Sequence, residues 1–124
     1  MPAPIVFFDI ASSELQSQKA FYEAVFGWDV STDGHFTAPS MSPLPGLLRV
    51  EAAEGFQPEK VIYLGVDDIA ATLETITSNG GAVVFPRMIV SGVVILALFT
   101  DPAGNRMGLV ELADGEPTAP PEET

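Results

Sequence analysis

The sequence predicts an α+β protein in which one strand–helix–strands plan is used twice. Short apolar runs at 5–10 and 61–66 are typical of buried strands, and each is followed by apolar residues at helical spacing. Further apolar runs then complete each half. We therefore expect two paired β-α-β-β-β modules, at about 5–52 and 61–112, within a single domain of residues 1–112.

The first helix is bounded by recognisable end signals. Ser13 with Gln16 three residues later matches the capping-box pattern, and Gly27 follows the last apolar residue of the periodic segment. After this helix we expect an extended segment at 28–30, and then a loop that holds a short strand around 35–37. The run LLRVEA predicts the next strand, at 47–52.

The second half has equivalent signals. Asp67 or Asp68 can cap a helix in which Ile69, Leu73 and Ile76 share one face, and SNGG ends it at 78–81. Three more strands are expected, at 82–85, 91–99 and 106–112, the last of them after a type I turn formed by Asp101, Pro102 and Gly104.

Composition excludes several classes of function. The 124 residues contain no Cys, so no disulfide, zinc–thiolate site or thiol nucleophile is expected. The net charge is -12 without any Lys/Arg cluster, which argues against nucleic acid and anionic membranes as partners. No apolar stretch approaches the ~20 residues of a membrane helix, and no basic leader is visible, so we expect a cytoplasmic protein. The acidic, Pro-rich segment 113–124 is expected to be a disordered tail.

Three segments in order, KAFYEAVFGWDV, YLGVDDIAATLETITSNGGAVV and FTDPAGNRMGLVE, resemble the vicinal oxygen chelate superfamily. This is the group of glyoxalases, bleomycin-resistance proteins and extradiol dioxygenases. The resemblance covers residues 5–112. It implies that the paired modules form a half-open barrel around a pocket, and that the chain forms a homodimer.

Metal-dependent members of that superfamily hold a divalent ion with His, Gln or Glu side chains. The resemblance carries these positions onto Phe7, Val61 and Gly108, with a fourth near Arg49 whose register is uncertain by about one residue. None of these side chains donates a lone pair to a metal, so no metal or other cofactor is expected. The alternative is a relocated divalent ion held by carboxylates and the histidine, namely Asp9, Glu51 and His35.

Candidate site residues follow from strand parity and chemistry. Phe7 and Val61 are expected as pocket walls. Asp9 shares the face of Phe7, so it is a candidate general base, although it can equally pair with Arg49. Tyr63 shares the face of Val61 and is a candidate ligand anchor or acid/base group, or else a core residue.

Three further residues have alternative interpretations. Arg49 can anchor an anionic or carbonyl-bearing ligand, or form a structural ion pair. His35 can be an acid/base group at the pocket mouth or a solvated loop residue. Gly108 either opens space in the pocket or lets an aromatic ring pack against the backbone. We expect Glu111, on the opposite face of the same strand, to be solvated.

The sequence therefore predicts a protein that binds a small apolar or aromatic molecule without a metal. The candidate ligand-binding residues are Phe7, Asp9, Arg49, Val61, Tyr63 and Gly108. Two alternatives stay open: a metal-dependent lyase or dioxygenase with a relocated ion, and a dimeric regulatory module without a ligand.

Overall fold

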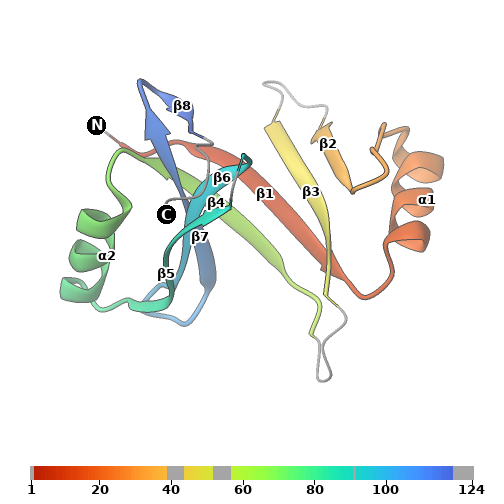
Figure 1. The fold of residues 1–124 in the computed structure, drawn as a ribbon. Helices are drawn as coiled ribbons and strands as arrows, with labels where there is room; N and C mark the ends of the chain where they lie inside the picture. Colours follow the sequence, from red (N-terminus) through yellow and green to blue (C-terminus); the bar gives the residue numbers. More distant parts are fainter. Residues whose placement is uncertain (1, 39–43, 52–56, 91, 119–124) are drawn as a thin grey trace. The chain divides into compact units, whose positions relative to one another are not determined.

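The computed structural model describes residues 2–38, 44–51, 57–90 and 92–118, and it divides them between two compact units. One unit is Phe7–Ile62, and the other joins Met1–Val6 to Tyr63–Thr124. Figure 1 shows one helix in each unit together with the strands of its sheet. The α+β class is thereby confirmed. No helix in the described ranges is long and apolar enough to cross a membrane.

The first unit builds a small sheet beside helix α1 (Leu15–Phe26). Strand β3 (Leu44–Val50) lies between β2 (His35–Ala38), with which it pairs antiparallel, and β1 (Ile5–Ser12), with which it pairs parallel. The beginning of β4 (Lys60–Val66) belongs here through Ile62, and the Glu59 carbonyl accepts from the Ala11 N–H at 2.9 Å.

The ends of α1 were predicted at nearly the right residues. Gly27 ends the helix in the left-handed conformation, with φ 70°, which glycine adopts without a Cβ clash. The N-cap is Glu14 rather than Ser13, because the Glu14 side chain accepts from the Gln16 N–H at 3.1 Å. The cap therefore lies one residue after the position that the capping-box pattern predicted.

The predicted extended segment at 28–30 is not a strand. Its Trp28 ring instead stacks against Tyr22 at 5.0 Å and against Phe36 at 4.6 Å, measured between ring centroids. The Val30 N–H donates to the Glu23 carboxylate at 3.3 Å, so it is not used in a strand ladder. Aromatic packing and this hydrogen bond fix the segment as the wall of a small core of Val30, Phe36 and Leu48.

The second unit has the full strand–helix–strands plan. Strand β4 runs parallel to β7 (Arg106–Ala113); β7 pairs antiparallel with β6 (Val94–Thr100), which pairs antiparallel with β5 (Ala82–Val90). Helix α2 (Ile69–Ser78) packs its buried Ile69 and Leu73 against this sheet. The predicted second module is thereby confirmed.

Two aspartate side chains form the helix cap and the turn that were predicted in this unit. The Asp68 carboxylate is the N-cap of α2 and accepts from the Ala71 N–H at 3.0 Å. Asp101 accepts from the N–H groups of Ala103 and Asn105 at 3.0 and 2.9 Å, which closes the turn before β7. The local turn chemistry was therefore readable from the sequence.

The acidic segment expected to be disordered from residue 113 instead begins with a turn and strand β8 (Glu116–Pro117). This strand pairs with the end of β7, where Leu112 lies opposite Pro117. Asp114 and Gly115 supply the positive φ angles of the connecting turn, 54° and 79°. Residues 119–124 of the expected tail lie outside the described residues.

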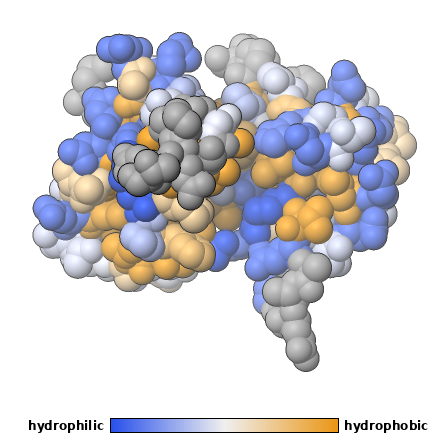
Figure 2. All heavy atoms as spheres, in the orientation of Figure 1, coloured by the Kyte–Doolittle hydropathy of each residue, from blue (hydrophilic) through white to orange (hydrophobic). Residues whose placement is uncertain are grey.

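Apolar side chains also reach the surface, as the orange spheres among the blue ones in Figure 2 show. On α1 the exposed members are Phe21, Val25 and Phe26. On the edge strand β5 they are Val83, Val84, Phe85 and Met88. The β5 edge is interrupted by Pro86 and by two register shifts, which are the features that limit pairing with another strand.

Candidate functional site

A pocket of about 490 Å³ lies in the first unit, on the face of its small sheet. It is shallow and open on one side, and Phe7 of β1 is the one residue of the predicted ligand-binding set that lines it. The other lining residues are Asp29, His35, Phe36, Thr37, Pro45 and Gly46. The pocket thus combines aromatic walls with a few polar groups, as small-molecule sites do.

Gly46 on β3 leaves room for two aromatic rings beside the strand. It lies opposite Phe8 of β1 and Phe36 of β2 in the sheet register. A Cβ at position 46 would come within 2.8 Å of both rings, which themselves pack edge to face at 5.5 Å. A side chain at this position would therefore force the two rings apart, which explains the glycine in PLPGLL.

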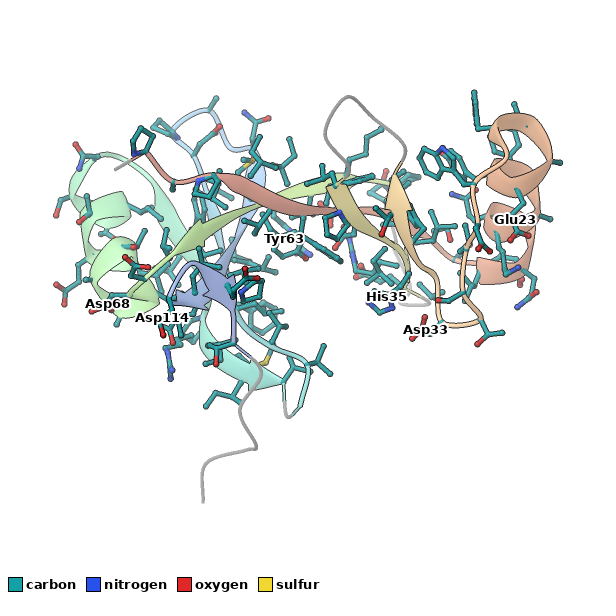
Figure 3. All side chains as sticks on the ribbon, turned by 90° about the horizontal axis from the view of Figure 1, so that it is seen from above. Glu23, Asp33, His35, Tyr63, Asp68 and Asp114 are labelled. Atoms are coloured by element: carbon teal, nitrogen blue, oxygen red, sulfur yellow. The ribbon has the colours of Figure 1, made fainter. Side chains whose placement is uncertain are left out.

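His35 begins strand β2 at the edge of the pocket, and Asp33 lies beside it in Figure 3. The His35 Nδ1 is 3.0 Å from the Asp33 carboxylate, and the Ser31 hydroxyl is hydrogen-bonded to the same carboxylate oxygen. The Ser31 hydroxyl, followed by the His35 imidazole and backbone N–H, holds the pKa of Asp33 at about 2. Asp33 is therefore ionised at neutral pH, and it orients the imidazole.

The turn that carries this pair is set by backbone hydrogen bonds. The Ser31 N–H donates to the His35 carbonyl at 2.9 Å, and Gly34 between them has φ 93°. A Cβ at position 34 would lie 2.5 Å from the Leu48 carbonyl oxygen, so glycine is required there. The position of His35 is thus fixed by a turn that is itself packed against β3.

Asp9 and Arg49 lie together in the same unit, within a charged cluster. Asp9 is 1% exposed, and its carboxylate is 3.3 Å from the Arg49 Nε. The Arg49 guanidinium also contacts the carboxylates of Glu51 and Glu59. Burial opposes the charge of Arg49, but these carboxylates more than compensate and raise its pKa. The pairing of Asp9 with Arg49, one of the two sequence interpretations, is present in the structure.

The residues predicted at metal positions offer no ligand atoms. Phe7 lines the pocket and Val61, 1% exposed, is part of the packed interior. The relocated site of Asp9, Glu51 and His35 does not form either, because both carboxylates face Arg49 instead. Among the residues that the structure describes, no three His, Asp or Glu side chains are grouped so that they could hold a metal ion.

Tyr63 and Gly108, the two remaining candidates, are direct neighbours in the second unit. They are paired in the parallel register of β4 and β7, and Tyr63 is 8% exposed. A Cβ at position 108 would lie 2.2 Å from the Tyr63 ring, well inside contact distance. The ring therefore packs directly on the glycine backbone, which is the aromatic-over-glycine arrangement found in sheets.

Glu111 is not solvated, contrary to the sequence expectation. Its side chain is 14% exposed and accepts from the Ile69 N–H at 3.1 Å and from Arg87 Nη2 at 2.8 Å. The carboxylate thus joins β7 to the first turn of α2 and to β5. A negative charge is favourable there because the helix N-terminus presents unpaired N–H groups.

Sequence reasoning did not single out most of the pocket residues. Phe36, Thr37, Pro45 and Gly46 come from the segment interpreted mainly as a loop, and Asp29 comes from the extended segment before it. The available signals were the apolar–polar alternation of HFTA and the Pro-Gly pair just before LLRV.

Comparison with known proteins identifies the family to which this architecture belongs. The model of the Glyoxalase/Bleomycin resistance protein/Dioxygenase superfamily matches residues 5–109. The chain belongs to this superfamily. The match runs from β1 to the middle of β7, so it includes residues of both units.

Two of the curated relatives are longer than this chain. The proposed glyoxylase CFP32 of Mycobacterium tuberculosis is 29% identical over 111 residues, which are 82% of this chain and 42% of that protein. The anthracycline biosynthesis protein DnrV of Streptomyces peucetius is 25% identical, over 91% of this chain and 50% of its own length. The chain thus spans about half the length of these relatives.

Solved structures share the fold of this superfamily member. A methylmalonyl-CoA epimerase in complex with methylmalonyl-CoA matches with a TM-score of 0.64 at 20% identity, over 92% of this chain and 97% of that one. A variant of the Streptomyces coelicolor epimerase matches with the same TM-score and identity, over 91% and 96%. At this identity the likeness concerns the fold.

Proposed function

We propose that this superfamily member binds a small apolar or aromatic molecule without a metal, in the pocket lined by Phe7. The observation that carries the proposal is the Phe7 side chain itself. It lies on the pocket wall, at the strand position where the resemblance to metal-dependent members would place a ligand atom. An aromatic ring there offers apolar contact area instead of a coordinate bond.

Two further observations support the proposal. The other positions that the resemblance assigns to metal ligands carry Val61, Gly108 and, near the fourth, an Arg49 that is surrounded by carboxylates. In addition, one relative is named for anthracycline biosynthesis. An aromatic ligand would suit the Phe7 ring, while the epimerase likeness carries no argument about substrate.

A calorimetric titration tests the proposal. The protein is first treated with a chelator and its metal content measured, and it is then titrated with uncharged aromatic probes such as naphthalene. We expect saturable binding in metal-depleted protein, and no gain in affinity when Mg²⁺, Mn²⁺, Ni²⁺ or Zn²⁺ is added back. Tightly held stoichiometric metal, with probe binding or turnover that depends on it, would favour the lyase or dioxygenase alternative.

We further propose that the chain works as a homodimer, with the exposed apolar face of α1 as the contact surface. This face comprises Phe21, Val25 and Phe26. Because the relatives are about twice as long as this chain, a second copy would give an assembly of similar size. Sedimentation equilibrium should give twice the monomer mass, and Phe21→Asp should shift it toward the monomer; a wild-type monomer at micromolar concentration would contradict this.

A further inference from the structure

The two nitrogens of the His35 ring have different roles in the pocket. Nδ1 is 3.0 Å from the Asp33 carboxylate, which accepts a hydrogen bond from it. Asp33 is held in place in turn by the Ser31 hydroxyl and by the His35 N–H. A carboxylate on Nδ1 selects the tautomer that carries its proton there, so Nε2 of the neutral ring is an acceptor.

Charge at the pocket selects against anions. Asp29 lines the pocket and Asp33 adjoins His35, so two carboxylates lie close to any bound ligand. In the described part of the pocket wall there is no Lys or Arg to offset them. An anionic ligand would therefore be repelled, whereas a neutral ligand would not.

The aromatic wall lies next to the acceptor. The rings of Phe7 and His35 are 6.4 Å apart and inclined at 51°, and both residues line the pocket. A flat ligand that packs on these rings would bring its edge toward the imidazole. A hydrogen-bond donor on that edge can then meet Nε2.

We infer that the pocket selects an uncharged aromatic ligand that carries a hydrogen-bond donor, such as a phenol, and that His35 Nε2 accepts this hydrogen bond. The inference rests on the proposed function and specifies its ligand class. Asp33 acts as a positioning residue, since it reaches the ligand only through the imidazole. Phe7 supplies aromatic contact area, and Asp29 with Asp33 excludes carboxylates.

Nitrogen NMR tests this directly, because His35 is the only histidine of the sequence. Its two ring signals are therefore assigned without mutagenesis. In free protein with a neutral imidazole we expect the Nδ1–H tautomer, and phenol should shift the Nε2 signal while anisole, which lacks the donor, should not. The Nε2–H tautomer, or equal effects of phenol and anisole, would overturn the inference.

Affinity measurements give a second test. His35→Phe keeps a ring but removes the acceptor, and Asp33→Ala removes the carboxylate that orients it. Both should weaken phenol binding about tenfold, the value of one hydrogen bond at a site, and leave anisole binding unchanged. Asp67→Ala removes an exposed carboxylate in the second unit and is the matched control, expected to have no effect.

The outcomes separate this inference from the proposed function. If phenol and anisole bind equally well to wild type and to both variants, the ligand class is wrong but aromatic binding stands. Benzoate binding as tightly as phenol would likewise overturn the ligand class. If neither uncharged aromatic probe binds, the proposed function fails and the inference fails with it.

Discussion

Gly108 is the residue whose presence in a strand is explained by one contact. A Cβ at position 108 would lie only 2.2 Å from the Tyr63 ring. We predict that Gly108→Ala lowers the free energy of unfolding by about 1–3 kcal/mol, the usual cost of overpacking. In a Tyr63→Ala background the same change should cost much less, because the ring is gone. Chemical denaturation of the four proteins measures this coupling; an alanine tolerated in the wild-type background would contradict it.

Arg49 is the cation on which the buried charge of Asp9 depends. Asp9 is 1% exposed, so loss of its neighbouring guanidinium would leave a buried carboxylate without its counter-ion. We predict that Arg49→Ala lowers the free energy of unfolding by about 3–5 kcal/mol. Glu51→Gln is the control, since the Glu51 side chain is 41% exposed and its loss should cost below about 1 kcal/mol. Equal costs in urea denaturation would contradict this account.

At the scale of elements, Glu111 joins α2 to the sheet, and this contact depends on pH. Hydrogen bonds from Arg87 lower the pKa of Glu111 from its usual 4.5; burial opposes the shift and the Ile69 N–H adds to it. A lowered folded-state pKa means that the stabilisation is complete above pH 4.5 and is lost as pH falls through the lower folded value.

We therefore predict that Glu111→Gln lowers the free energy of unfolding by about 1 kcal/mol at neutral pH. The difference in the free energy of unfolding between variant and wild type should become smaller as the pH falls below 4.5. Denaturant unfolding at several pH values measures this difference. Glu74→Gln, which removes an exposed charge on α2, is the control and should show no such dependence; a difference for Glu111→Gln that stays constant with pH would refute the coupling.

Elements whose signals are local could be predicted from the sequence. Gly27, Asp68 and the Asp101 turn act within a few residues of themselves, so their patterns are visible along the chain. Segment 28–30 is not assigned to a strand, and the packing of Trp28 on Phe36 depends on a partner eight residues away in another element, which no local pattern reveals.

For the whole molecule, the superfamily and the α+β class followed from the sequence, but the contacts at the candidate residues did not. The pairing of Tyr63 with Gly108 depends on the register of strands 45 residues apart, which no local pattern encodes. The pocket residues His35 and Asp29 come from a turn-rich segment whose geometry depends on Gly34 against β3. Chemistry that arises from such long-range juxtaposition needs the structure.

The central claim is that the pocket lined by Phe7 binds an aromatic ligand without a metal, and one comparison tests it most directly. The dissociation constant for naphthalene is measured by fluorescence on chelator-treated wild type, Phe7→Ala and Phe85→Ala. Phe85 is an equally aromatic but exposed residue on β5 and is the matched control. We predict that Phe7→Ala weakens binding about tenfold or more, as the loss of a buried ring contact implies, and that Phe85→Ala leaves it unchanged. Equal affinity in all three proteins, or no binding until metal is restored, would contradict the claim.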